Sequence, residues 1–311
     1  MQAAAMALSC TVCVSAAEDE TIKLTVWGAE EDQDLLKELT DKFQEKYADQ
    51  KFDIQIGVES ESTAKDTILT DVEAGADVYA FADDQLTDLV KAGALLKLDD
   101  YAEALQLADT TLDDVKAANV EGAIDAASWD SLLEAADKAG KKVGMTLASG
   151  NLVACVSGTW DAITAQDVFG DGYAATKLPT FTVGDKQVQQ GSVAGYKYVG
   201  VNGYSENSGW AVLLAEYLTN EESQQMFFDQ RESGPSNKNV AASDSVQENV
   251  ALAALSAQSE YAQAQKVGGK YWDPAQTFGE LVAQGTLSAD DDNAIQEALD
   301  NLVDGVTAPV E

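Results

Sequence analysis

The hydrophobic pattern changes period several times in the first third of the chain. Residues 21–28 (TIKLTVWG) alternate, with Ile22, Leu24 and Val26 on one face, which predicts a strand. Residues 33–47 then carry apolar side chains at helical spacing, which predicts an amphipathic helix. A strand at 52–58, a helix at 63–74 and a strand at 77–81 follow in the same way. This βαβαβ order predicts a parallel sheet with right-handed crossovers.

A continuous apolar run lies near the middle of the chain. Residues 152–156 (LVACV) predict a short strand buried on both faces. The turn of Ser157, Gly158 and Thr159 then places Trp160 just beyond the carboxyl end, where open α/β sheets bind ligands. Further strands are expected at 95–98, 143–147, 173–181 and 191–201. Further helices are expected at 83–92, 112–119, 129–139, 210–218, 250–264, 278–284 and 290–303. A capping box from Thr219 to Glu222 predicts the start of one more helix after 210–218.

Composition excludes several classes of function. The net charge of −35 over 311 residues opposes binding to nucleic acid or anionic lipid. The chain has no histidine, which removes His-dependent catalytic triads and the usual zinc sites. Asp290 to Asp292 lack the mid-loop Gly and the terminal Glu of a calcium loop. We therefore expect no metal, no cofactor and no nucleic-acid partner.

The N-terminal residues predict export. Residues 1–17 are small and apolar without an acidic residue, and they end in VSAA before Glu18, so residues 1–20 read as the remnant of a signal peptide. A lipoprotein signal, with Cys10 or Cys13 lipidated, is the alternative. Cys155 is expected to be a small buried hydrophobe. The mature chain is thus expected to be extracellular or at the cell surface, secreted or lipid-anchored, and periplasmic in a Gram-negative cell.

Six segments together resemble a known family. They are TVWGAEED (25–32), GADVYAFADD (75–84), VSGTWDA (156–162), ATKLPTF (175–181), GYKYVGVN (195–202) and SENSGWAVLLAEYLTNEESQ (205–224). The chain resembles the extracellular solute-binding proteins of ATP-driven sugar importers, in particular the maltodextrin-binding type. The resemblance implies a receptor that binds an oligosaccharide by hinge closure, is not an enzyme, acts as a monomer and delivers the sugar to the permease subunits of an ABC importer.

The resemblance also implies a fold class. It is α/β, the two-lobe, type II fold of periplasmic binding proteins. The first lobe would comprise 21–109 and 158–225, and the second 110–157 and 226–311, with the strand at 152–156 running between them. Compared with the family, segments are missing between Ala127 and Ser128 and between Gly150 and Asn151. We therefore expect a complete first lobe and an abridged second lobe.

The candidate site residues follow from the chemistry of sugars. A sugar has apolar C–H faces and hydroxyl groups in the ring plane, so its site needs flat aromatic rings beside carboxylates. Asp84 and Trp272 are favoured because the family places a sugar-binding carboxylate after the same strand and a stacking aromatic in a similar loop. The candidates are Trp27, Glu30, Glu31, Glu59, Asp83, Asp84, Trp160, Tyr271 and Trp272.

Each candidate also has a purely structural interpretation. Trp27 could be a core or rim residue, and Glu30 and Glu31 could favour a helix start. Asp83 and Asp84 could cap the next helix. Trp129 and Trp210 lie on helical apolar stripes and are assigned to the core. Two other functions remain open: a truncated remnant or secreted scaffold without transport activity, and a carboxylate-based glycosidase.

Overall fold

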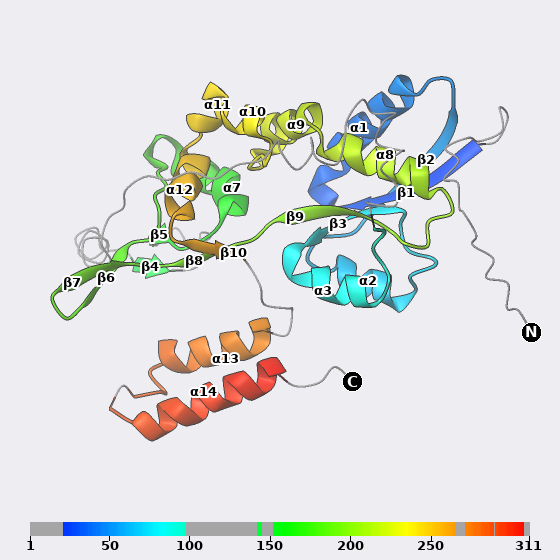
Figure 1. Ribbon diagram of the computed structural model, residues 1–311. Helices are drawn as coiled ribbons and strands as arrows, with labels where there is room; N and C mark the ends of the chain where they lie inside the picture. Colours follow the sequence, from blue (N-terminus) through cyan, green and yellow to red (C-terminus); the bar gives the residue numbers. More distant parts are fainter. Residues whose placement is uncertain (1–20, 98–141, 145–151, 265–270, 289, 308–311) are drawn as a thin grey trace, which may run out of the picture.

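A four-stranded sheet forms the core of the first lobe. The computed structural model describes residues 21–97, 142–144, 152–264, 271–288 and 290–307 (Figure 1). The strand order is β2-β1-β3-β9, with β1 parallel to β2 and β3, and β9 antiparallel to β3. This confirms the predicted parallel βαβαβ unit. The strands are β1 (Thr21–Gly28), β2 (Lys51–Val58), β3 (Val78–Ala82) and β9 (Lys197–Val201).

Helices cover both faces of this sheet (Figure 1). Alternation along β1 sends Leu24 and Val26 toward one face, where they join the cluster formed with α1 and α8. Trp27 points to the other face and packs on a second cluster that includes Ile68 and Leu89. A sheet covered on both sides leaves little room for an exposed aromatic in β1. The helices are α1 (Gln33–Lys46) and α8 (Ser208–Thr219) on one face, and α2 (Ala64–Thr70) and α3 (Leu86–Lys91) on the other.

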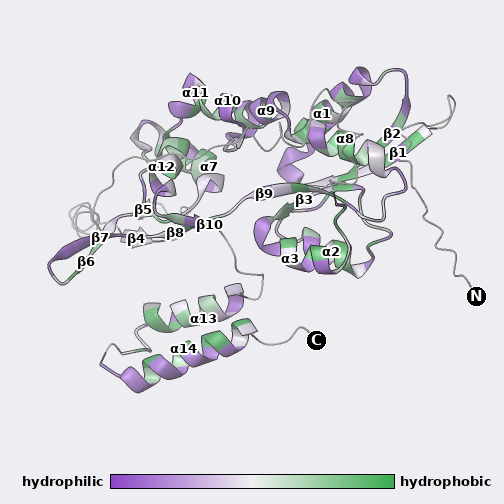
Figure 2. Ribbon diagram, viewed as in Figure 1, coloured by the Kyte–Doolittle hydropathy of each residue, from purple (hydrophilic) through white to green (hydrophobic). Residues whose placement is uncertain are grey.

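Helix α8 completes the first core. Its residues from Trp210 to Ala215 are all buried, and Figure 2 shows hydrophobic residues along it. Trp210, 7% exposed, is a core residue as predicted. The next helix, α9 (Glu221–Arg231), is capped by Asn220, whose side chain accepts a hydrogen bond from the Ser223 N–H. The predicted capping box beginning at Thr219 is therefore wrong, because Thr219 is still the last residue of α8.

The second part of the molecule has small sheets. Among the described residues, three two-stranded sheets pair β4 with β5, β6 with β7 and β8 with β10. Gln258, 8% exposed, joins segments here: its amide donates to Gln190 and Ser192 and accepts from the Leu178 N–H. The elements are β4 (Lys142–Gly144), β5 (Leu152–Cys155), α7 (Ala162–Phe169), β6 (Thr180–Val183), β7 (Lys186–Gln189), β8 (Ser192–Ala194), α10 (Lys238–Ala241), α11 (Asp244–Gln247), α12 (Val250–Ser259) and β10 (Ala262–Ala264).

One extended segment joins the two parts. Residues 192–201, called the crossover segment below, pair with β10 through β8 and with β3 through β9 (Figure 1). The single strand predicted at 191–201 is thus two strands, because the chain leaves one sheet and enters another between Ala194 and Lys197. The lobe boundaries expected from the resemblance stay a prediction.

A helical hairpin lies near the C-terminus. It consists of α13 (Trp272–Ala283) and α14 (Asp292–Thr307), which pack against each other. The ring of Pro274 lies so close to Gly305 that a Cβ added there would come within 2.7 Å of it. The helix predicted at 278–284 begins earlier, at Trp272. Pro274 lies in its first turn, where a proline is tolerated.

Several other predicted elements are corrected. The strand at 152–156 is shorter, and its described side chains, Ala154 to Val156, are half-buried rather than buried on both faces. Residues 95–97 form no strand, although the Leu96 N–H donates to the Val201 carbonyl. The strand at 173–181 begins only at Thr180, and the helices at 63–74 and 250–264 end at Thr70 and Ser259. The elements predicted at 112–119 and 129–139, and the signal remnant at 1–20, lie outside the described residues.

Glu216 provides a test of the packing under α8. Its Oε2 is buried and has no hydrogen-bond partner among the described residues, and burial raises the pKa of this carboxyl, opposed by the charge of Lys46. The folded state thus holds the proton to higher pH than the unfolded state, so wild-type stability is lost as pH rises through the raised pKa. Glu216→Gln is expected to increase the free energy of unfolding at pH 7 in urea titrations.

The pH dependence provides the control for that substitution. The gain from Glu216→Gln should shrink as pH falls below the raised pKa toward the ordinary value of 4.5, because wild-type Glu216 is then neutral as well. The same change at the exposed Glu73 should do little at either pH. A gain at Glu216 that stays constant with pH would contradict the assignment to a buried charge.

Candidate functional site

A carboxylate and an indole from distant parts of the chain meet at the end of β3. A short turn, η2 (Asp83–Gln85), follows β3 and carries Asp84. The Trp272 Nε1–H donates to Asp84 Oδ2 over 2.7 Å, joining residues 188 positions apart. The other oxygen, Asp84 Oδ1, is buried and has no partner among the described residues. A buried acceptor without a donor is unfavourable, so this oxygen could accept a hydroxyl hydrogen bond in a conformation that opens it to a ligand.

Aromatic surface lies beside this carboxylate. Trp272 is 44% exposed, and its ring contacts that of Tyr271 edge-on, with centroids 5.3 Å apart and an interplanar angle of 78°. Trp272 therefore combines an exposed aromatic ring with a donor fixed on Asp84. The expectation that Trp272 lies in a loop is wrong, because it is the first residue of α13.

Asp83 is fixed by the crossover segment. Its backbone N–H donates to the Tyr196 carbonyl, and its Oδ2 accepts from the Tyr196 N–H, both over 3.1 Å. Burial raises the pKa of the Asp83 carboxyl; the Tyr196 N–H opposes this shift and the charge of Asp84 adds to it. Neither Asp83 nor Asp84 caps the following helix with its side chain, so the capping interpretation does not explain them.

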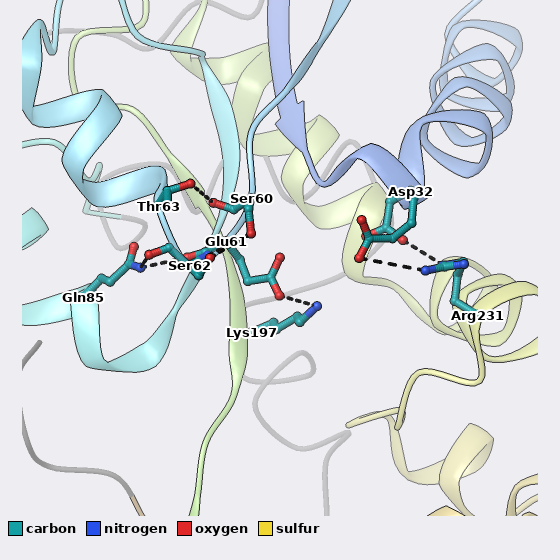
Figure 3. A network of polar contacts seen from close by, with 9 residues as sticks. Asp32, Ser60, Glu61, Ser62, Thr63, Gln85, Lys197 and Arg231 are labelled. Atoms are coloured by element: carbon teal, nitrogen blue, oxygen red, sulfur yellow. Dashed lines mark hydrogen bonds and ion pairs between the residues drawn. The ribbon is translucent and has the colours of Figure 1, made fainter. Parts of the chain in front are cut away.

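Figure 3 shows two ion pairs in one view with Gln85, the last residue of η2. Lys197, in β9, bonds to Glu61 over 2.5 Å, and Arg231, at the end of α9, donates to Asp32 over 3.1 Å. Burial raises the pKa of Asp32, and the charges of Lys197 and Arg231 oppose this shift. Gln85 donates to the carbonyls of Glu61 and Ser62 and so holds the loop before α2 against η2.

Trp27 lies elsewhere. Its ring contacts Tyr79 with centroids 6.4 Å apart and packs on the cluster beneath the sheet. The part of the ring that stays accessible lines a shallow pocket of about 490 Å³ together with Asp66, Thr67, Thr70, Asp71, Ala74 and Gly75. The structure therefore places Trp27 beside α2, and no hydrogen bond or ring contact joins it to Asp84 or Trp272 among the described residues.

The remaining candidates are spread out. Glu30 and Glu31 are exposed in the turn η1 (Glu30–Asp32), and Glu31 lies 4.0 Å from Arg231. Glu59 accepts a hydrogen bond from the Thr63 hydroxyl. Trp160, in η5 (Thr159–Asp161), is 79% exposed and its ring lies against Gly158. Within the described part of the chain, none of these four contacts Asp84 or Trp272 through a hydrogen bond or ring pair.

Sequence reasoning overlooked some residues of this region. Tyr196, Lys197 and Tyr198 are consecutive in the crossover segment, and Arg231 ends α9. The alternation in GYKYVGV could have indicated that both tyrosines share one face. Nothing in the sequence indicates that Arg231 meets Asp32.

The described residues contain no group of three or more potential metal ligands. The chemistry available at Asp83, Asp84, Tyr271 and Trp272 is hydrogen-bond acceptance by carboxylates beside aromatic rings, which is suited to an uncharged polyol. No helix in the described ranges is both long and apolar enough to span a bilayer.

A comparison with protein-family models finds one match, to residues 138–254. This segment matches the bacterial extracellular solute-binding proteins. It includes the crossover segment, α8 and α9, so the solute-binding match covers the elements that connect the two parts of the molecule. No curated protein sequence matches the chain.

Solved solute-binding proteins share the fold. A structure solved with acarbose has 24% identity and a TM-score of 0.70 over 91% of this chain and 98% of that one. The maltodextrin-binding protein MalE1 of L. casei has 18% identity and a TM-score of 0.73 over 93% and 99%. The GacH receptor of Streptomyces glaucescens has 14% and 0.68 over 94% and 100%. At these identities the likeness establishes the fold, which is the two-lobe α/β fold predicted from the sequence.

Proposed function

We propose that the chain is an extracellular receptor that binds a maltodextrin-type oligosaccharide and passes it to an ABC importer. The similar structures support the ligand class: MalE1 is named a maltodextrin-binding protein, and GacH was solved in complex with acarbose. The match of residues 138–254 to extracellular solute-binding proteins supports the class of receptor.

The contact between Asp84 and Trp272 carries the proposal. It joins η2 in the first lobe to α13 near the C-terminus, with one carboxylate oxygen on the indole N–H and the other buried without a partner. Once a change of conformation opens Asp84 Oδ1, which is buried in this structure, a sugar hydroxyl would donate to it while the pyranose C–H face lies against the Trp272 ring. Asp83 and Tyr271 are the chain neighbours of these two residues, and the Tyr271 ring contacts that of Trp272.

The receptor would act by closing its lobes about the crossover segment. The ligand would shift the population toward the closed form because some of its contacts form only in that form. No bond is broken, so the chain is not an enzyme. We further propose that it is a monomer, carries no cofactor, is exported by its N-terminal signal, and docks on the permease subunits of the importer.

Isothermal titration of the full chain with maltotetraose tests this function, with cellotetraose as a control of equal length and different linkage. We expect saturable heat with maltotetraose, and a loss of at least about tenfold in affinity for Trp272→Ala, since the stacking surface is removed.

Two outcomes would overturn the proposal. No heat from a chain with a folded circular-dichroism spectrum would favour a remnant or scaffold without transport function. Release of reducing ends from maltotetraose, measured over hours at the same protein concentration, would favour a carboxylate-based glycosidase.

A further inference from the structure

The crossover segment carries two exposed tyrosines at alternate positions. Tyr196 is 48% exposed and Tyr198 is 40% exposed, and residues two apart along an extended chain share one face. Their rings are nearly parallel, at 23°, with centroids 6.4 Å apart. Two partly exposed, nearly parallel rings on one face of the segment offer accessible aromatic surface to a ligand.

This surface is supported from beneath. The Tyr198 ring packs on Phe81 with centroids 5.6 Å apart, and Phe81, 2% exposed, packs in turn on the fully buried Tyr79. The backbone of Tyr198 is also fixed by strand pairing with Phe81. The fold buries Phe81 and Tyr79 almost entirely yet leaves the two outer rings partly exposed, so packing accounts for the inner rings and not for Tyr196.

A carboxylate is held beside the two rings. The paired backbone hydrogen bonds between Tyr196 and Asp83 keep the acid in register with the crossover segment. The charge of Asp83 reaches the Tyr198 hydroxyl: burial raises the pKa of that phenol, and Asp83 and then Tyr196 add to the shift. Flat rings with an acceptor at their edge match a pyranose, whose C–H face stacks while its equatorial hydroxyls donate.

We propose that Tyr196 and Tyr198 form a second stacking subsite for a sugar ring, located on the crossover segment and completed by Asp83. The inference rests on the proposed function and deepens it. Asp84 with Trp272 would hold one glucose unit, and the tyrosine pair would hold another unit of the same oligosaccharide. Affinity should then rise with chain length from maltose to maltotetraose, because only longer sugars reach both surfaces.

The test is a titration series with maltose, maltotriose and maltotetraose on the full chain and on Tyr196→Leu, Tyr198→Leu and the double variant. Leucine keeps an apolar side chain on the strand but removes the flat ring. The double variant is expected to lose roughly fivefold to tenfold in affinity for maltotetraose and about twofold or less for maltose, as expected for the loss of one stacking contact. Tyr204→Leu is the matched control, since Tyr204 is also 48% exposed.

The failures are distinguishable. Equal affinity of the wild type and the double variant for all three sugars would overturn the subsite while leaving the proposed function intact. Equal losses for maltose and maltotetraose would also overturn it, because they would indicate an effect on the first surface or on the fold. If the wild type binds none of the sugars, the proposed function fails and the subsite with it. Variants that unfold would be replaced by Tyr196→Ile and Tyr198→Ile, which favour strands.

Discussion

Asp84→Asn is expected to weaken maltodextrin binding by roughly 10- to 150-fold, which corresponds to the 1.5–3 kcal/mol that a hydrogen bond to a charged group contributes. The variant loses the charge that strengthens the bond to a sugar hydroxyl, and its amide N–H₂ would occupy the place of the free Oδ1. There it would face a hydroxyl as a donor rather than as an acceptor. Isothermal titration with maltotetraose measures the loss.

The same substitution should not reduce stability. The amide oxygen can keep the hydrogen bond from Trp272 Nε1. Asp84 Oδ1, which is buried and has no donor among the described residues, is replaced by a neutral amide nitrogen that costs less to remove from water than a charged oxygen. Urea titration should therefore give a free energy of unfolding equal to or above that of the wild type. Asp53→Asn, on an exposed position of β2, is the control and should change neither quantity. Unchanged affinity in Asp84→Asn would contradict the assignment of this carboxylate to the sugar.

Phe43→Ala is expected to cost about 3–5 kcal/mol in the free energy of unfolding, the largest effect on stability that we predict. Phe43 is 0% exposed and lies among the rings of Tyr47, Phe52 and Tyr217, with centroids 4.9, 5.4 and 5.7 Å away. Truncation would leave a cavity between α1, β2 and α8, because these neighbours are held by their own elements and cannot collapse fully into the space.

The matched control is Phe181→Ala. Phe181 is 43% exposed on β6, so the same truncation removes little buried surface and should cost well under about 1 kcal/mol. Urea unfolding followed by tryptophan fluorescence measures both variants. Similar losses for the two substitutions would show that the cluster around Phe43 is not the packing centre of the first lobe.

The first-lobe sheet was predictable because its signals are local. In β1 the alternation of Ile22, Leu24 and Val26, and in α1 the spacing from Leu35 to Phe43, each indicate one element and its buried face. The same reasoning gave the wrong result for the crossover segment. Its residues look like one strand, but the partner changes from β10 to β3 along its length, and partner choice is a tertiary property that no local pattern encodes.

The candidate site was predictable only in part. The family resemblance singled out Asp84 and Trp272, and the structure brings them together across 188 residues of sequence. Trp27 was chosen for its place at a strand end. The alternation of side chains along β1 turns its ring toward α2, where it packs against the second cluster. The tyrosines of the crossover segment were missed because a strand residue is usually assigned to packing, and only the exposed fractions of the rings show otherwise.

The position of α8 has a consequence for synthesis of the chain. The first three strands are complete by residue 82, yet the helix that shelters Leu24 and Val26 ends only at Thr219. Until α8 is synthesised, α1 is the one helix of this cluster available to cover that face of the sheet, and partly covered strands are prone to misassociation. A chain that ends before α8 is therefore expected to leave part of the apolar face of its sheet open to water.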